Sequence, residues 1–353
     1  MDFETEQKFL LSKHVGYLLA NLQQLPAPYA GQESNRLTLA YFAVVGLKML
    51  DALDEGAVPE ITEWVYSLQV IPEKGQVENG TCYGFRGSPS LGIPYSETGV
   101  PSQHQYDSAN IAATYSALAI LRSFGDDLSR VAREPILRTL QRLQQSDGSF
   151  GSVCAEAESD MRFVFCAAAI CSILGDQTAI DVDAAVQFIH RSRGYSGGFG
   201  LASGLEAHGG ATYCAVAALK LLERLPRQGN ALGTEANGCG RTGTEGMGTT
   251  LEWCLQRQTS SGGLQGRANK DADTCYAFWV GASLEMLGGY SFLDRQSLRR
   301  FLFRCQNQKY GGFSKHPGEL PDLLHTFYGI CGLSLVGQDG LRRIDVSLGV
   351  PVT

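Results

Sequence analysis

The residues best suited to chemistry lie in one short stretch, 263–279 (GLQGRANKDADTCYAFW), which carries two cations, two carboxylates, a thiol and a tyrosine hydroxyl. The cations Arg267 and Lys270 could hold an anion. Asp273 and Cys275 could hold zinc, which accepts oxygen, nitrogen and sulfur ligands. Residues two apart do not face each other on a helix, so this pair can converge only on a turn or at the first residues of a helix. The alternative is a capped helix start with a buried cysteine.

His325 is a candidate third ligand, separated from Cys275 by 49 residues. This spacing matches no zinc finger. A structural zinc normally has four protein ligands, whereas three leave an open position of the kind a catalytic zinc needs. A substrate thiol could occupy that position and would then lose its proton.

Length, composition and charge limit the classes of protein to which this chain can belong. The chain has 353 residues, 44% hydrophobic content and a net charge of −7. Its length predicts either two domains or a repeat architecture. Mild acidity argues against nonspecific nucleic-acid binding but allows a local cationic pocket. The acidic first residues lack a signal-peptide pattern, and the apolar runs are too short to span a membrane. We therefore expect a cytoplasmic protein whose ten cysteines are reduced.

A repeating pattern follows three helices expected at 9–25, 36–53 and 61–71. In each copy a glycine-containing turn presents one bulky apolar residue, and a polar loop and a helix of small apolar residues come next. The bulky residues are separated by 65, 49, 65 and 49 positions, and they are Phe85, Phe150, Phe199, Leu264 and Phe313. Amphipathic helices are expected between the copies, at 131–143, 180–190, 249–258 and 293–306.

Each repeat is thus a helical hairpin that cannot bury its apolar face alone and must stack on its neighbours. The simplest arrangement is all-α, a closed ring with the small-residue helices around a central cavity, and an open solenoid is the alternative. The segment 226–250 is rich in glycine and threonine without periodicity, so we expect a flexible surface excursion rather than a linker. The prediction is one domain over 1–353.

The start of the small-residue helix carries polar side chains in the last three repeats: His208 in the third, the 267–276 cluster in the fourth, and Lys315 to His325 in the fifth. The first two repeats show no such clustering. Parallel inner helices would bring these starts to one mouth of the ring, where exposed backbone N–H groups favour anions. A diphosphate suits the combination. Taken singly, each residue could be an ordinary solvated loop charge.

Five motifs together carry a family resemblance: NRLTLAYF, SDMRFVF, HGGATYCAVAAL, GRANKDADTCYAFW and YGGFSKHPGELPDLLHTFYG. Over nearly its whole length the chain resembles the β subunits of protein prenyltransferases, and most closely those of the type I geranylgeranyl class. The resemblance implies an α/α toroid. It also implies a catalytic subunit that transfers a geranylgeranyl group from geranylgeranyl diphosphate to the cysteine of a C-terminal CaaX motif.

The resemblance assigns roles to particular residues. The implied zinc ligands are Asp273, Cys275 and His325, and Lys315 joins them in the catalytic set. The implied diphosphate contacts are His208, Arg267, Lys270, Tyr276 and Lys315. The lipid tunnel would include Thr38, Phe165, Cys214 and Trp279. The peptide contacts would be Thr38, Phe42, Asn110, Ala112, Glu158, Arg162, Phe163 and Leu324. Apolar members of these sets would also be ordinary core residues.

Three differences favour geranylgeranyl over farnesyl transfer. Thr38 stands where the farnesyl enzyme has a tryptophan that shortens the tunnel. Lys315 stands where it has an aspartate that binds magnesium, so Mg²⁺ should be dispensable. Leu324 stands where it has a tyrosine. The Rab-type enzyme usually has Gly-Arg-Pro-Glu-Lys where this chain has Gly-Arg-Ala-Asn-Lys at residues 266–270, so the chain resembles that enzyme less. Asn110 replaces a histidine of the relatives.

The resemblance also implies partners. These are an α subunit in an obligate heterodimer, geranylgeranyl diphosphate, and small GTPases of the Rho type whose CaaX motif ends in Leu or Phe. Three alternative functions remain open: a farnesyltransferase β subunit, a toroidal terpene cyclase and a noncatalytic scaffold. A terpene cyclase uses an acidic motif such as Asp-x-Asp-Asp, which Asp271-Ala272-Asp273 matches only in part.

Overall fold

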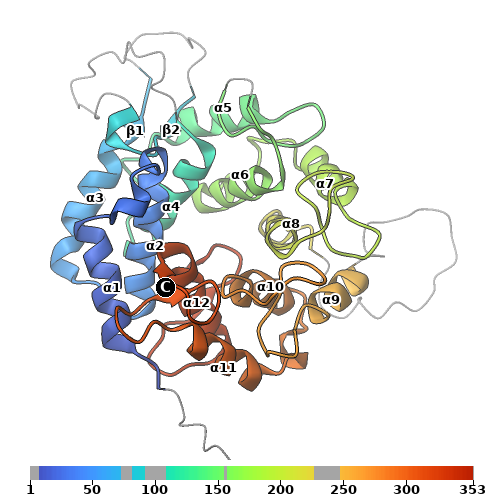
Figure 1. The fold of residues 1–353 in the computed structure, drawn as a ribbon. Coiled ribbons are helices and arrows are strands. Elements are labelled where there is room, and N and C mark those ends of the chain that lie inside the picture. The colour runs from blue at the N-terminus through green and yellow to red at the C-terminus, as the bar shows by residue number, and fades with distance from the viewer. Residues whose placement is uncertain (1–7, 73–81, 92–108, 155–156, 226–246, 353) are drawn as a thin grey trace, which may run out of the picture.

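In the computed structural model, which describes residues 8–72, 82–91, 109–154, 157–225 and 247–352, helices form two concentric layers (Figure 1). The inner helices are α2 (Arg36–Met49), α4 (Ile111–Phe124), α6 (Met161–Leu174), α8 (Gly209–Leu221), α10 (Tyr276–Met286) and α12 (Leu323–Val336). The outer helices are α1 (Leu11–Gln23), α3 (Val58–Ser67), α5 (Arg133–Leu143), α7 (Val182–Arg191), α9 (Met247–Leu255) and α11 (Arg295–Cys305).

The ring is closed. Each inner helix packs on the next one, and α12 packs on α2, which completes the circle. The colour in Figure 1 accordingly runs once around the molecule and returns to its start. The α/α toroid is therefore confirmed and the open solenoid is wrong.

The strands in the described residues are each two residues long, and they pair with one another to connect loops. They are β1 (Gln69–Val70) with β2 (Gly84–Phe85), β3 (Phe313–Ser314) with β4 (Pro321–Asp322), and β5 (Ile344–Asp345) with β6 (Val350–Pro351), all antiparallel. The turn between β5 and β6 rests on two inner helices. The hydroxyl of Tyr41 on α2 donates to the Gly349 carbonyl at 2.6 Å, and that of Tyr115 on α4 donates to the Leu348 carbonyl at 2.8 Å.

Sequence pattern explains which helices lie inside. The inner helix α6 is apolar on nearly all faces, and most of its residues are buried, as expected for a helix surrounded by others. The outer helix α5 buries one stripe, Ile136, Leu137, Leu140 and Leu143. Small residues let inner helices approach closely: a Cβ added to Gly332 on α12 would lie 2.7 Å from the Cβ of Ala277 on α10.

The five bulky residues that mark the repeats are fully buried, as the sequence predicts. Each pairs in an antiparallel bridge with a residue that follows an outer helix; the pairs are Gln69 with Phe85, Gln144 with Phe150, Arg193 with Phe199, Gln258 with Leu264, and Gln306 with Phe313. Each bridge therefore ties the end of an outer helix to the turn that leads into the next inner helix.

The turn glycines explain how neighbouring repeats dock. Gly148, Gly197 and Gly262 have φ of +86°, +99° and +88°, and a Cβ on any of them would lie 2.1–2.5 Å from a backbone carbonyl of the next outer helix. Gly311 in the last repeat has the same geometry, with a Cβ position 2.1 Å from the Lys13 carbonyl of α1. The contact that joins successive repeats thus also joins the last repeat to the first helix.

His14 on α1 completes this closure. Its Nδ1 accepts the Gly312 N–H at 2.9 Å, its Nε2 lies 2.9 Å from Oε1 of Gln306, and its ring stacks on Phe313 at 4.6 Å. Because Nδ1 accepts, Nε2 must carry the proton and donate to Gln306, so the geometry requires the neutral ring. Burial lowers the His14 pKa to about 4, although the bond to Gln306 opposes the shift.

Two expectations need correction. Cys82 and Cys154 form a disulfide, so the expectation of ten reduced cysteines is wrong for this pair. The expected excursion at 226–250 lies mostly outside the described residues, and its last four residues begin α9. None of the helices within the described residues is both long and apolar enough to cross a membrane.

The closure at His14 generates a prediction about pH. Between its ordinary pKa of about 6.5 and the folded value of about 4, the unfolded chain binds a proton that the folded chain excludes. Stability should therefore fall as the pH is lowered from 7 toward 4, by about 3 kcal/mol from this one group.

The measurement is chemical unfolding of the wild type and of His14→Gln at several pH values. Glutamine does not titrate, so the variant should be less stable at pH 7 and should lose less stability on acidification. Equal pH slopes for the two proteins would contradict this account of His14.

Candidate metal centre and anion-binding mouth

Asp273, Cys275 and His325 come together at the starts of two neighbouring inner helices. Asp273 and Cys275 lie on the turn that leads into α10, and His325 is in the first turn of α12. The turn before α10 is joined to the segment that leads to α12, because the Thr274 N–H donates to the Lys315 carbonyl at 3.1 Å. The Thr274 hydroxyl also donates to the Ser314 carbonyl at 2.7 Å. These contacts explain why Cys275 and His325, which are separated by 49 intervening residues, can meet.

The three side chains each offer one ligand atom, and these atoms lie within 4.8 Å of one another. Nε2 of His325 is 3.2 Å from Oδ1 of Asp273, and the Cys275 N–H donates to the same oxygen at 2.9 Å. The pair Asp273 and Cys275 thus converges on a turn, as the sequence requires. The alternative of a capped helix start with a buried cysteine describes the same turn and does not exclude a metal.

The electrostatics of this cluster are those of a site that needs a cation. Burial opposes ionisation of Asp273, but hydrogen bonds from His325 and Cys275 outweigh it and lower its pKa. Burial would lower the His325 pKa, but its bonds to Asp273 and Asp322 raise it to about 9. Burial and the nearby Asp273 charge raise the pKa of the Cys275 thiol. In the absence of a metal, a proton on His325 thus balances two carboxylates.

The donor set fits zinc. One oxygen, one nitrogen and one sulfur ligand leave a fourth position open, which is the pattern of a catalytic rather than a structural zinc. Among the residues that the structure describes, these form the only group of three such side chains close enough to hold an ion. Nζ of Lys315 lies 4.0 Å from Oδ2 of Asp273, so the expected fourth member of the catalytic set is adjacent.

Asp322 is a site residue that the sequence analysis missed. It caps α12: its Oδ1 accepts the His325 N–H at 2.9 Å, while its Oδ2 lies 2.6 Å from Nδ1 of His325. A carboxylate in this position fixes the orientation of a metal-binding histidine and raises its basicity. The signal that could have found it is an aspartate three positions before a histidine at the start of an apolar helix.

His208 and Tyr276 lie at adjacent inner-helix starts. Nδ1 of His208 accepts the Ala211 N–H at 3.3 Å and so caps α8, which leaves Nε2 as the donor in the neutral ring. Burial and the charge of Arg267 lower the His208 pKa. Burial raises the Tyr276 pKa to about 12, so its hydroxyl remains a donor at neutral pH.

Two glycines make room for Tyr276. A Cβ on Gly209 would lie 2.8 Å from the Tyr276 ring, and a Cβ on Gly266 would lie 2.1 Å from it. The Gly209 N–H donates to the Gly266 carbonyl at 2.8 Å, which ties the third repeat to the fourth. The predicted diphosphate contacts His208, Arg267 and Tyr276 are therefore held on one connected pair of loops.

The remaining predicted cations differ in their surroundings. Nη1 of Arg267 is 2.5 Å from Oε2 of Glu206, with 44% of the arginine side chain exposed. Lys270 is exposed, and within the described part of the chain its ammonium group has no ion-pair partner. Lys315 is half exposed beside Asp273.

The second repeat also carries polar residues at its inner-helix start, so the expectation that the first two repeats lack them is wrong for this one. Arg162 donates to Glu158 at 2.9 Å and to Asp160 at 2.5 Å, and Asp160 caps α6. The hydrogen bond to Asp160 raises the Arg162 pKa. The structure thus brings together the predicted pair Glu158 and Arg162 and adds Asp160 to it.

A continuous circle of aromatic rings lines the inner helices. Successive ring centroids are 5.2–5.8 Å apart, and the rings in order are Tyr41, Tyr115, Phe165, Tyr213, Phe278, Tyr328 and Phe42, which returns to α2. Trp279 contacts both Tyr276 and Tyr328, at 5.4 and 4.8 Å. The predicted tunnel residues Phe165 and Trp279 are therefore part of one aromatic assembly that connects the six inner helices.

Several residues near this circle are only half-buried although they lie on inner helices. They are Thr38, Tyr115, Cys214, Trp279 and Tyr328. The Thr38 hydroxyl lies 3.3 Å from the Ser116 hydroxyl on α4. Among the predicted peptide contacts, Phe42 and Phe163 are buried, whereas Ala112 and Leu324 are half-buried. Ordinary core packing and a binding role coexist for these apolar side chains.

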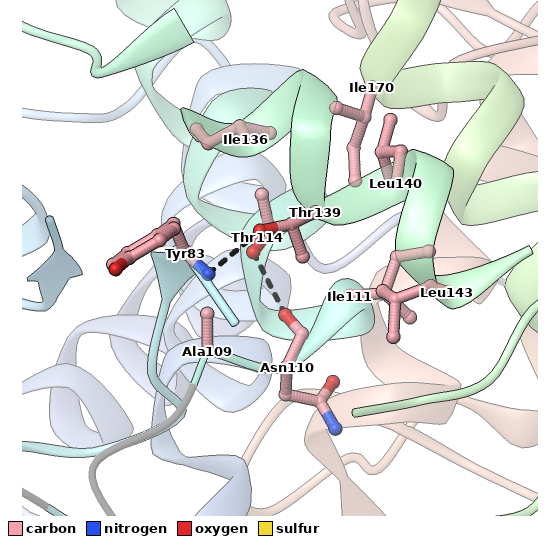
Figure 2. Close-up of a pocket in the computed structure, with 10 residues that line it drawn as sticks. All are labelled: Tyr83, Ala109, Asn110, Ile111, Thr114, Ile136, Thr139, Leu140, Leu143 and Ile170. Atoms are coloured by element: carbon pink, nitrogen blue, oxygen red, sulfur yellow. Dashed lines mark hydrogen bonds between the residues drawn. The ribbon is translucent and has the colours of Figure 1, made fainter. Parts of the chain in front are cut away.

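Asn110 has a local role that the sequence did not reveal. Its Oδ1 accepts the N–H groups of Ala112 and Ala113 at 2.8 and 3.3 Å and so caps α4. Asn110 also lines a small pocket with Tyr83, Thr114 and Thr139, and Figure 2 shows its side-chain amide directed away from these three residues. The amide nitrogen is therefore the group that remains to act as a donor.

Comparison with known proteins agrees with this geometry. Residues 9–350 match the prenyltransferase alpha-alpha toroid domain. The chain is 43% identical to the geranylgeranyl transferase type-1 subunit beta of Arabidopsis thaliana, over 98% of this chain and 89% of that protein. It is 38% identical to the protein of the same name from Dictyostelium discoideum, over 92% and 90%. The chain belongs to the prenyltransferase α/α-toroid family.

Within that family, its identity to these relatives places it with the β subunits of type-1 geranylgeranyl transferases, which are protein prenyltransferases. A solved structure agrees: Candida albicans protein geranylgeranyltransferase-I complexed with geranylgeranyl diphosphate (GGPP) superposes with a TM-score of 0.82 at 25% identity. The alignment covers 98% of this chain and 96% of that one.

The role of Asp322 can be tested with Asp322→Asn. Asparagine is an equally good helix cap, so the fold should persist, but it cannot supply the negative charge beside His325. Loss of such a partner typically weakens metal binding about 10- to 100-fold. The measurement is zinc affinity by chelator competition.

Asp181→Asn is the matched control, because Asp181 caps α7 in the same way and its element carries none of the ligands. The control should retain wild-type affinity. Wild-type zinc affinity in Asp322→Asn would show that the carboxylate does not support the site.

Proposed function

We propose that this chain is the catalytic β subunit of a zinc-dependent protein geranylgeranyltransferase of type I. It would join the geranylgeranyl group of geranylgeranyl diphosphate to the cysteine of a CaaX motif, with Leu or Phe preferred at the last position. The observation that carries the proposal is the placement of a three-ligand cluster next to cationic and hydroxyl donors, at the starts of α8, α10 and α12.

Asp273, Cys275 and His325 would hold the zinc. When bound there, zinc would lower the pKa of a substrate thiol, which is otherwise near 8.5, so that the thiol can act as a nucleophile at neutral pH. Asp322 keeps the His325 ring oriented, with its Oδ2 2.6 Å from Nδ1. The low pKa of Asp273 keeps that carboxylate ionised and available as a ligand.

His208, Arg267, Lys270, Tyr276 and Lys315 would bind the diphosphate of the lipid donor. Negative charge builds on the diphosphate as its bond to the first lipid carbon breaks, and donors already in place stabilise that charge. Loss of one such donor typically costs about 2–4 kcal/mol of transition-state stabilisation. Lys315, which lies 4.0 Å from Asp273, would supply positive charge in place of Mg²⁺.

The lipid chain would lie against the aromatic circle. Half-buried positions on the inner helices, including Cys214 and Trp279, support a tunnel along the axis. Thr38 is small and half-buried beside Ser116, and its small side chain would leave room for a chain of twenty carbons. A tryptophan at this position would fill that room.

The peptide would contact Phe42, Ala112, Phe163 and Leu324 through its last residues. Glu158 and Arg162 would lie near its terminal carboxylate, and their mutual ion pair at 2.9 Å keeps them in one place. Asn110 would donate from its amide nitrogen, since its oxygen is used in capping α4.

The proposal includes the partners that the resemblance implies: an α subunit and CaaX-ending small GTPases of the Rho type. A cytoplasmic location is part of the proposal, and seven of the nine cysteines among the described residues are free, while Cys82 and Cys154 are paired. A terpene cyclase is less well supported, because Asp273 is engaged by His325 and Asp271 is exposed. A noncatalytic scaffold would not require the three ligands to converge.

The direct test is a prenylation assay of the heterodimer with geranylgeranyl and farnesyl diphosphates, and with peptides ending in Leu or Met. We expect geranylgeranyl transfer to the Leu-ending peptide to be preferred and to proceed with zinc but without added Mg²⁺. Thr38→Trp should shift the donor preference toward the fifteen-carbon lipid, because the larger side chain would shorten the tunnel.

Thr178→Trp is a control for the effect of a large side chain, since Thr178 lies outside the inner helices. It should retain the wild-type preference. A wild-type preference for farnesyl diphosphate would favour the farnesyltransferase alternative. An unchanged preference in Thr38→Trp would remove the argument that Thr38 sets the lipid length.

A further inference from the structure

Glu206 forms an ion pair with the guanidinium group of Arg267, which the proposed function assigns to binding the diphosphate. Its Oε2 accepts from Nη1 of Arg267 at 2.5 Å. Glu206 lies two residues before His208, in the loop that leads into α8, and Arg267 lies in the corresponding loop before α10. The proposed anion site therefore contains a carboxylate that competes for one of its own cations.

The backbone holds this pair in register. The Gly209 N–H donates to the Gly266 carbonyl at 2.8 Å, and each of these glycines is within three residues of one partner in the ion pair. Both also pack against the Tyr276 ring, which fixes the separation of the two loops. The spacing of the two loops is thus fixed by contacts that do not involve the charged groups of Glu206 and Arg267.

The ion pair is exposed, with 67% of the Glu206 side chain and 44% of the Arg267 side chain accessible to solvent. Exposed pairs of this kind contribute only about 0.2–1 kcal/mol. A diphosphate carries more than one negative charge and can accept a bidentate guanidinium bond, so it should displace the single carboxylate. The pair is weak enough to open when an anion binds.

The surrounding charges are mixed. His208 is subject to the positive charges of Arg267 and Arg162 and to the negative charges of Glu206 and Asp160. Lys270 is exposed in the same loop as Arg267. Removing the Glu206 charge would leave the cations in excess at this mouth and would strengthen anion binding.

We propose that Glu206 is a positioning residue: it holds Arg267 while the anion site is empty and takes it back when inorganic diphosphate leaves. The inference rests on the proposed function, since it assumes that this mouth binds diphosphate. Glu206 would thereby weaken retention of the product and shorten the time for which inorganic diphosphate occupies the site.

The test compares Glu206→Gln with the wild type as heterodimers, with inorganic diphosphate as the probe in a calorimetric titration. We expect Glu206→Gln to bind diphosphate about 2- to 5-fold more tightly, which corresponds to loss of an exposed ion pair. Glu206→Asp retains the charge and should restore much of the wild-type affinity. Glu252→Gln, an exposed position on α9, is the matched control and should change nothing.

A double-mutant cycle tests whether Glu206 acts through Arg267. In an Arg267→Gln background, Glu206→Gln should have little effect, because the group it competes for is gone. If the wild type binds diphosphate and Glu206→Gln binds it equally or more weakly, the inference about Glu206 is wrong and the proposed function stands. If the wild type does not bind diphosphate, the anion site of the proposed function itself fails.

Discussion

The rest of the structure depends on the contact that closes the ring. Hairpins stacked in a line would leave one apolar face exposed at each end, and closure removes both ends at once. The last repeat docks on α1 through Gly311, whose missing side chain allows the Lys13 carbonyl to approach, and His14 bonds to the turn beside it. Closure also keeps the starts of α8, α10 and α12 side by side at one mouth, where the candidate site lies.

At that mouth, the fold brings together charged side chains, each of which is stabilised by a neighbouring group of opposite charge. Asp273 and Asp322 flank His325 within 3.2 and 2.6 Å, and the hydrogen bonds to these carboxylates raise the pKa of His325 and so favour a proton on its ring. A metal ion would replace that proton and would be held by side chains already close together. One inner-helix start away, Arg267 is balanced by Glu206 in the same manner. In both places, at His325 and at Arg267, a positive charge is paired with a carboxylate, and a ligand can displace one member of the pair.

Much of this arrangement could be predicted from the sequence. The anchors such as Phe199 and Leu264, the small-residue helices and the 65- and 49-residue spacings indicate a ring of hairpins. The motifs around Asp273 and His325 indicate the ligand set. These features are visible because they repeat or because their residue types are specialised for chemistry.

What the sequence did not reveal depends on side-chain pairing across loops. Glu206 and Asp322 are ordinary loop acids until the fold places them beside Arg267 and His325. The Cys82–Cys154 disulfide joins residues 72 positions apart that no local pattern connects. The aromatic circle was also missed, although each inner helix carries an aromatic residue near its start, because its closure appears only when six helices meet.

The most direct test of the central claim is the metal content and ligand chemistry of the purified heterodimer. Zinc is measured by mass spectrometry, and Co²⁺ substitution reports a thiolate ligand through its sulfur-to-metal absorption band. The account predicts one zinc ion per β chain and a thiolate band that disappears in Cys275→Ser but persists in Cys254→Ser, a buried cysteine away from the cluster. Undiminished zinc and an unchanged thiolate band in Cys275→Ser would contradict it.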